Sequence, residues 1–88
     1  MSVVIRLQRK GRRNESHFFI VVMDSREKPT GRFIEKLGHY HPTSFVFDGL
    51  NYVIDTNKVK KWGTLGAQMS PSVLEIYDKA ITSEEKKQ

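Results

Sequence analysis

The spacing of apolar residues changes character at Thr56, and this change limits the folds open to a chain of 88 residues. Before Thr56 the apolar residues alternate or form short runs, which is typical of β-strands. After it they recur every three or four residues, which is typical of helices. Because strands followed by helices pack as a sheet with the helices on one side, we expect a single small α+β domain. Its sheet should be mostly antiparallel or mixed, with about four to five strands, and its two C-terminal helices should pack on one face.

Three strands are expected in the first 40 residues. Residues 3–8 alternate between apolar and polar side chains, which predicts a strand with one face in the core. Residues 17–23 are apolar on both sides and too short for a typical helix, so we expect a central strand. Residues 32–40 alternate again, and this pattern places Lys36 on the same face as Tyr40.

A short hairpin is expected at Asp48-Gly49. This pair separates the apolar runs 45–47 and 50–54, and both of its residues tolerate the positive φ of a type I′ turn. The two runs should therefore pair as the last strands of the sheet.

The first helix is expected to begin near residue 56. Asp55 or Thr56 fits the N-cap, and Gly66 fits the position that ends the helix. Trp62 lies midway along the apolar stripe and is expected to anchor this helix to the sheet.

The second helix is expected after Ser70-Pro71, because a serine hydroxyl caps helices and proline is tolerated at the first helical position. Its expected apolar stripe consists of Val73, Leu74, Tyr77, Ala80 and Ile81. Residues from Thr82 onward are charged, so we expect residues 1–81 to form a single domain and residues 82–88 to form a frayed tail.

Positive charge is concentrated in the N-terminal half. Residues 1–41 hold nine lysines and arginines against four acids, whereas residues 42–88 hold six of each sign, so the first half accounts for the net charge of +5. Unpaired like charges repel, and such a cluster usually persists where a polyanion neutralises it. Nucleic acid is the commonest such partner, and a solvated charge run is the alternative.

The basic residues are interleaved with aromatic ones, a combination that suits RNA. Arginine matches phosphate oxygens with a planar fork, and aromatic rings stack on bases. We expect the positive side chains to project from one end of the domain, with Phe18, Phe19 and Phe33 in the core. The candidate RNA-binding residues are Arg6, Arg9, Lys10, Gly11, Arg12, Arg13, Arg26, Lys28, Arg32, Lys36, His39 and Tyr40. Lys58, Lys60 and Lys61 form either a second, weaker phosphate contact or a solvated helix face.

Metal and catalytic sites are not expected. His39 and His41 are two residues apart and point to one side of a strand, but a third ligand is missing, and the chain has no cysteine. The sequence has no nucleophile elbow, glycine-rich phosphate loop or telling acid pair, so we predict neither enzyme activity nor a cofactor. Asp24 and Glu35 are expected to pair with Arg26, Arg32 or Lys36. No run approaches the roughly 20 apolar residues of a membrane span, and we expect an intracellular soluble protein.

Several runs also match a known family in order and spacing along residues 3–80. They are Ile5-Arg6-Leu7 followed by Arg9-Lys10-Gly11-Arg12-Arg13, Ile20-Val21-Val22 closed by Asp24-Ser25-Arg26, the run 31–38 leading to Tyr40 and Pro42, and Gly66-Ala67-Gln68 after Trp62. In these runs the chain resembles the bacterial-type family of small-subunit ribosomal protein number sixteen. The run 31–38 is the most specific of them.

The resemblance implies a structural constituent of the small ribosomal subunit. Such a protein binds the five-prime region of the small-subunit ribosomal RNA and stabilises its fold during assembly. The implied partners are that RNA and neighbouring small-subunit proteins, with no cofactor, small-molecule substrate, membrane or self-association. The charge pattern also selects the RNA contacts that the resemblance implies, with Gly11 shaping the loop. They are Arg6, Arg9, Lys10, Arg12, Arg13, Arg26, Arg32 and Lys36. We expect the cytoplasmic ribosome, with an organellar ribosome as the alternative.

The chain departs from the family pattern in three places. His17-Phe18-Phe19-Ile20 stands where Pro-Phe-Tyr-Arg is common, so one basic residue is lost. His39 and His41 stand where Tyr and Asn are common, and residues 43–54 are more apolar than the usual connection. Two other classes stay open, namely a free-standing RNA- or DNA-binding regulator, and a protein-interaction module or hydrolase.

Overall fold

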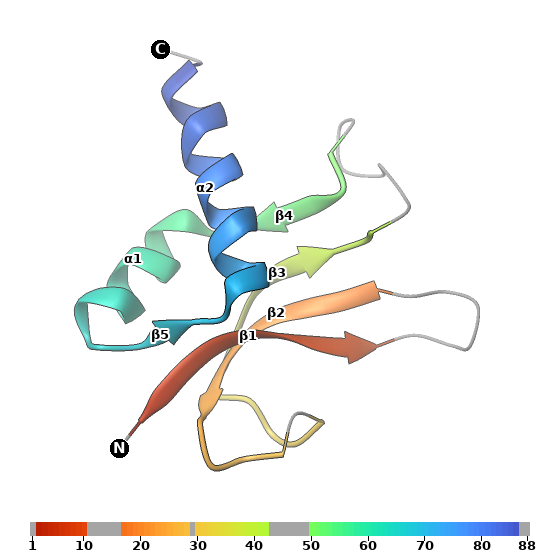
Figure 1. Ribbon diagram of the computed structural model, residues 1–88, viewed down its shortest axis with the longest axis vertical. Helices are drawn as coiled ribbons and strands as arrows, with labels where there is room; N and C mark the ends of the chain where they lie inside the picture. The colour runs from red at the N-terminus through yellow and green to blue at the C-terminus, as the bar shows by residue number, and fades with distance from the viewer. Residues whose placement is uncertain (1, 11–16, 29, 43–49, 87–88) are drawn as a thin grey trace.

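The computed structural model describes residues 2–10, 17–28, 30–42 and 50–86. Within them five strands form one curled sheet, and two helices pack against it (Figure 1). In chain order the elements are β1 (Val3–Lys10), β2 (His17–Asp24), β3 (Glu35–Tyr40), β4 (Tyr52–Ile54), α1 (Thr56–Thr64), β5 (Gln68–Met69) and α2 (Pro71–Lys86).

The sheet has the order β4-β3-β2-β1-β5. The pairs β1–β2, β2–β3 and β3–β4 are antiparallel, and the pair β1–β5 is parallel. The prediction that residues 17–23 form a central strand is confirmed, because β2 has two strands on each side. The mixed sheet followed by two helices also confirms the predicted α+β class.

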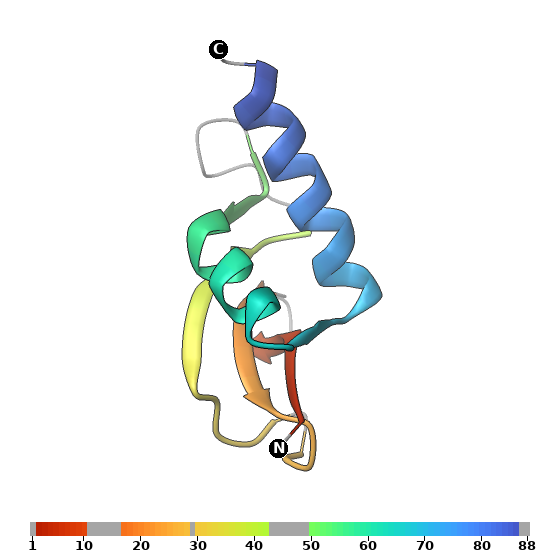
Figure 2. The ribbon, with the colours of Figure 1, turned by 90° about the vertical axis from the view of Figure 1, so that its left-hand side faces the viewer.

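One face of the sheet packs against both helices, as predicted, and α2 runs along one side of the strands (Figure 2). The core consists of Ile5, Ile20, Val22, Leu37 and Tyr52 from the sheet with Val59, Val73, Ile76 and Ala80 from the helices. Trp62 is partly buried against this cluster, where the sequence places a core anchor. The opposite side of the sheet is called the helix-free face below.

The ends of α1 agree with the sequence signals. The Asp55 side chain accepts a hydrogen bond of 3.1 Å from the Lys58 N–H, so Asp55 is the N-cap. At the other end, Gly66 has a φ of 96° and donates to the Gly63 carbonyl, while Ala67 donates to the Trp62 carbonyl. This pair of bonds is a Schellman motif, which requires the left-handed conformation that glycine adopts without strain.

The residues after Gly66 form a strand that the sequence pattern does not reveal. Gln68 and Met69 pair in parallel with β1, and the Ser70 N–H extends this pairing with a 2.9 Å bond to the Ile5 carbonyl. The Ser70 hydroxyl then lies 3.4 Å from the Val73 N–H that it caps. A single short segment therefore ends one helix, extends the sheet and starts the next helix.

The buried stripe of α2 differs from the predicted one at two positions. Ile76 is 5% exposed and belongs to the core, whereas Leu74 is 44% exposed. The helix also continues past Thr82, where the sequence suggests a frayed tail, and residues 82–86 are helical. Glutamate and lysine are strong helix formers, and they favour this extension.

β3 contains a bulge and begins at Glu35 rather than at residue 32. Two consecutive residues of β2, Ile20 and Val21, pair with Gly38 and Lys36, so Leu37 is an extra residue in the ladder. A bulge interrupts the alternation of side chains along a strand. Lys36 therefore lies on the helix-free face, and the prediction that it shares a face with Tyr40 is wrong.

Gly38 sits at this bulge because two strands approach closely there. A Cβ at Gly38 would overlap the carbonyl oxygen of Val53 in β4. The predicted hairpin at Asp48-Gly49 lies outside the described residues. Of its two runs, residues 52–54 form β4 and pair with β3.

The connection between β2 and β3 folds back across one end of the helix-free face. Gln8 Nε2 donates a hydrogen bond of 2.7 Å to the Gly31 carbonyl oxygen, and Gln8 is 1% exposed. Val21 and Met23, which face the same side from β2, are fully buried. The sheet is thus apolar on both faces at this end, and its other end carries polar and aromatic side chains.

Candidate nucleic-acid interface

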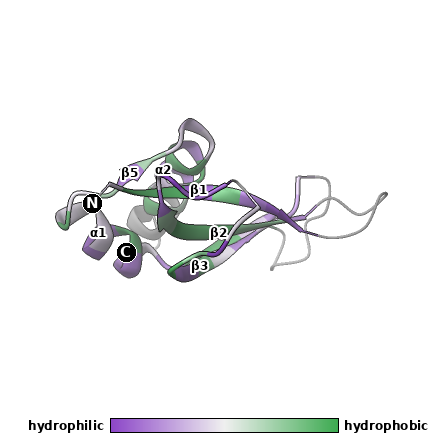
Figure 3. Cartoon of the chain, turned by 90° about the horizontal axis from the view of Figure 1, so that it is seen from below, coloured by the Kyte–Doolittle hydropathy of each residue, from purple (hydrophilic) through white to green (hydrophobic). Residues whose placement is uncertain are grey.

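The helix-free face gathers several of the predicted RNA-binding residues. Arg6 and Lys10 of β1 both lie on this face. Lys36 and His39 of β3 lie on it too, because the bulge between them shifts the alternation of side chains. β1 becomes hydrophilic toward its C-terminal end, which points away from α1 (Figure 3). The described strand positions of this face carry no carboxylate, so the positive charge there is not neutralised within the sheet.

Phe19 lies between two of these cations. The Lys36 ammonium nitrogen is 4.6 Å from the centroid of the Phe19 ring, and the Lys10 nitrogen is 5.6 Å from it. Both distances fall in the range of cation–π attraction. The prediction that Phe18, Phe19 and Phe33 belong to the core is wrong, because the first two are half-buried and Phe33 is 38% exposed.

Three histidines join Phe19 to form a block of four rings, called the ring block below. His17 and His41 are stacked, with centroids 5.2 Å apart and an interplanar angle of 11°. The Phe19 ring meets the His39 ring edge-on, with centroids 5.4 Å apart, and is tilted by 51° against the His17 ring at 6.0 Å. All four rings are half-buried.

His17 and His41 are not among the RNA-binding residues predicted from the sequence. The signal was present in the spacing, because His17 precedes Phe19 by two residues and His41 follows His39 by two. His17 and Phe19 therefore share a face of β2, the antiparallel register places His39 beside Phe19, and His41 follows directly after β3 and stacks on His17. Among the described residues, no three histidine or acidic side chains are arranged to hold a metal ion.

The surroundings of His39 keep its imidazole neutral. Partial burial lowers the pKa of His39 below its ordinary value of 6.5, and the positive charge of Lys36 and the neighbouring His41 and His17 lower it further. Near neutral pH, His39 therefore contributes a flat ring more than a positive charge.

The second group of predicted residues lies in the connection between β2 and β3. Arg26, Lys28 and Arg32 are all exposed there. Since β2 runs eight residues, roughly 25 Å, from His17 to Asp24, this group starts at the end of the sheet remote from Lys10. The prediction that the positive side chains project from one end is wrong, because the connection carries a second group.

Arg26 is held by Asp24, as predicted. Its Nη2 lies 3.1 Å from Asp24 Oδ2, and its backbone N–H donates a 2.9 Å hydrogen bond to Oδ1. These hydrogen bonds lower the pKa of Asp24 and raise the pKa of Arg26. The prediction for Glu35 is wrong, because Glu35 pairs with Lys58 of α1 at 3.8 Å rather than with Arg32 or Lys36.

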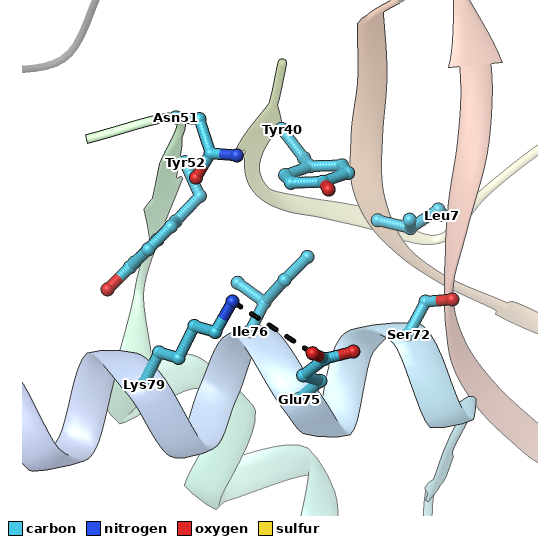
Figure 4. A pocket seen from close by; sticks show the side chains of 8 residues that line it. All are labelled: Leu7, Tyr40, Asn51, Tyr52, Ser72, Glu75, Ile76 and Lys79. Atoms are coloured by element: carbon cyan, nitrogen blue, oxygen red, sulfur yellow. Dashed lines mark ion pairs between the residues drawn. The ribbon is translucent and has the colours of Figure 1, made fainter. Parts of the chain in front are cut away.

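The remaining candidates lie apart from both groups. Arg9 is exposed, and Tyr40 lies on the helix side, where it lines an open pocket of about 110 Å³ between the sheet and α2 (Figure 4). Glu75 and Lys79, which form an ion pair at 3.9 Å, flank the same pocket. Lys60 and Lys61 are exposed on α1. Gly11, Arg12 and Arg13 lie outside the described residues.

Neither helix of the described chain is long and apolar enough to cross a membrane. The helix-free face carries cations, histidines and aromatic rings, and the connection beside it carries further cations. This combination is typical of surfaces that contact RNA phosphates and bases.

Comparisons with known proteins point in the same direction. The family model described as Ribosomal protein S16 matches residues 9–70. The chain is 40% identical over 79 residues to the small ribosomal subunit protein bS16 of Caldanaerobacter subterraneus, covering 90% of this chain and 93% of that relative. It is 39% identical over 79 residues to the small ribosomal subunit protein bS16 of Halothermothrix orenii, covering 90% of this chain and 86% of that relative.

Proposed function

The chain belongs to the ribosomal protein S16 family and is a constituent of the small ribosomal subunit, and from this premise we propose that it binds and stabilises folded small-subunit ribosomal RNA. The RNA is the five-prime region of the small-subunit molecule, and binding supports its folding during assembly. The role is structural and not catalytic. Neighbouring small-subunit proteins are further partners, and the ribosome is that of a bacterial cytoplasm.

The observation that carries this proposal is the charge of the helix-free face. Arg6, Lys10 and Lys36 share it, and its described strand positions hold no carboxylate. RNA helices repel each other when they approach, and cations placed between them reduce this cost. The sheet fixes the backbone positions from which these side chains project, so no backbone ordering is needed when RNA binds.

The connection between β2 and β3 supplies a second contact. Asp24 holds the Arg26 guanidinium at the start of the connection, yet the Arg26 side chain remains 80% exposed. Lys28 and Arg32 are exposed beside it. The Gln8–Gly31 hydrogen bond holds this connection against the helix-free face, so its cations extend the positive surface of that face.

Association with small-subunit particles tests the proposal. The tagged full-length chain is expected to co-purify stoichiometrically with small-subunit RNA and to bind a transcribed five-prime fragment of that RNA. Replacing both Arg12 and Arg13 by alanine is expected to weaken this binding while the melting temperature changes little. Stable nucleic-acid complexes outside ribosomal particles, without small-subunit association, would instead indicate a free-standing regulator. Loss of stability with RNA affinity intact would mean that the two arginines are structural.

A further inference from the structure

The location and the arrangement of the rings in the ring block are explained neither by the charge of the helix-free face nor by core packing. It places four half-buried rings side by side on the helix-free face, where neither α1 nor α2 covers them. His17 and His41 are nearly parallel, and Phe19 and His39 lie in the adjoining row of the sheet. Rings fixed on a sheet in this way are typical of surfaces that stack nucleobases.

We propose that the ring block is a stacking surface for unpaired nucleotides of RNA. This inference rests on the proposed function and adds to it the kind of RNA structure that is recognised. Bases within a duplex stack on one another and hide their faces, whereas unpaired bases in loops, bulges and ends expose them. A row of rings therefore selects unpaired segments.

The charges beside the ring block match a nucleotide backbone. Lys10 lies across the β1–β2 pair from His17, and Lys36 reaches Phe19 from β3. Their ammonium groups lie 5.6 Å and 4.6 Å from the Phe19 centroid. A nucleotide whose base stacks on the rings would bring its phosphates within reach of these two side chains.

The neutral state of His39 favours stacking over charge as the role of the rings. Lys36, His41 and His17 surround His39 with positive or protonatable groups, and partial burial adds to their effect. At neutral pH its imidazole offers a flat surface, while Lys10 and Lys36 supply the charge. If the rings stack and the two lysines supply the charge, an uncharged aromatic ring should be able to replace a histidine of the ring block.

Two substitutions at His41 distinguish stacking from charge in the full-length protein. His41→Phe keeps a flat ring and removes the titratable group, whereas His41→Lys removes the ring and adds a positive charge. The probe is a short single-stranded RNA of uridines with a central 2-aminopurine, whose fluorescence is quenched when the base stacks. A duplex containing the same strand is the control probe.

The wild-type protein is expected to quench the single-stranded probe and to bind it more tightly than the duplex. His41→Phe should keep most of this affinity, and His41→Lys should lose roughly five- to 150-fold, as found for the loss of one stacked base. Affinity that is kept by His41→Lys and lost by His41→Phe would overturn the inference. So would wild-type binding without quenching.

A second pair of variants guards against misfolding at His41. His17→Phe and His17→Lys make the same comparison from β2, and thermal melting identifies any variant that fails to fold. Binding to the five-prime ribosomal RNA fragment is measured in parallel. If the wild type binds that fragment but neither quenches nor prefers the single-stranded probe, the stacking inference fails and the proposed function stands. If it binds neither RNA, the proposed function itself fails.

Discussion

The side-chain amide of Gln8 in β1 donates a 2.7 Å hydrogen bond to the carbonyl oxygen of Gly31 in the connection between β2 and β3. Gln8 is 1% exposed, so this bond forms in the absence of competing solvent. It ties the connection between β2 and β3 to the first strand. It therefore also fixes the position of Arg32, the next residue along the connection, relative to the sheet.

Gln8→Leu is expected to destabilise the fold by about 1–3 kcal/mol, because a side chain of similar size leaves the Gly31 carbonyl without its donor. Urea denaturation followed by circular dichroism measures the change. Gln68→Leu is the matched control, since Gln68 is exposed in β5, and a small effect is expected there. Equal effects from both variants would show that the hydrogen bond contributes nothing specific.

Gly38→Ala is expected to be destabilising by about 1–3 kcal/mol or more, because its Cβ would overlap the Val53 carbonyl oxygen and force β4 away from β3. Gly63→Ala is the control. Gly63 lies within α1 with no atom close to the position of an added Cβ, so alanine should stabilise the helix by roughly 0.5–1 kcal/mol. Thermal melting should show a lower melting temperature for Gly38→Ala and a higher one for Gly63→Ala. An unchanged melting temperature for Gly38→Ala would contradict the close approach of the strands.

Acidification is expected to destabilise the free protein through His39. The folded state lowers the pKa of His39, so below about pH 6.5 the unfolded chain binds the proton more readily than the folded one. The stability contribution is therefore present above about pH 6.5 and is lost as the pH falls through the lowered value. Denaturation between about pH 7.5 and about pH 5.5 measures this loss. His39→Gln should flatten the dependence, and an unchanged slope would assign it to other groups.

Binding to the five-prime ribosomal RNA fragment is expected to weaken steeply with salt. If about five phosphates are neutralised, the slope of log affinity against log salt should be roughly −3.5 to −4.5. Replacing Lys10 and Lys36 by alanine should reduce this slope by about 0.7–0.9 for each lysine removed.

Replacing Lys60 and Lys61 of α1 removes the same charge from another part of the surface, and the slope should then stay close to that of the wild type. Equal changes from the two pairs would mean that net charge, and not the helix-free face, determines binding. A flat salt response in the wild type would reject the electrostatic account.

Local signals predicted the parts of the fold that local chemistry controls. Asp55 caps α1 and Gly66 ends it, because a carboxylate accepts the free N–H groups and glycine alone adopts the required φ without strain. Residues 17–23 were identified as a central strand because an apolar run on both faces has to be covered on both faces.

Features that depend on contacts between distant segments were not predicted. The bulge at Leu37 arises from the pairing of β2 with β3, and it moved Lys36 to the other face. β5 is two residues long, too short to show any period. Gln8 follows the polar alternation of an exposed position, yet the connection covers it. The ring block likewise needed the register of two strands.

The parallel pairing of Gln68 with Val4 joins the beginning of the chain to its last third. During synthesis the outer edge of β1 stays open until that late segment has emerged, and the sheet cannot be completed earlier. Folding of the sheet is therefore expected to finish only after residues 68 and 69 have emerged, and truncation before residue 70 would leave an unpaired strand edge prone to aggregation.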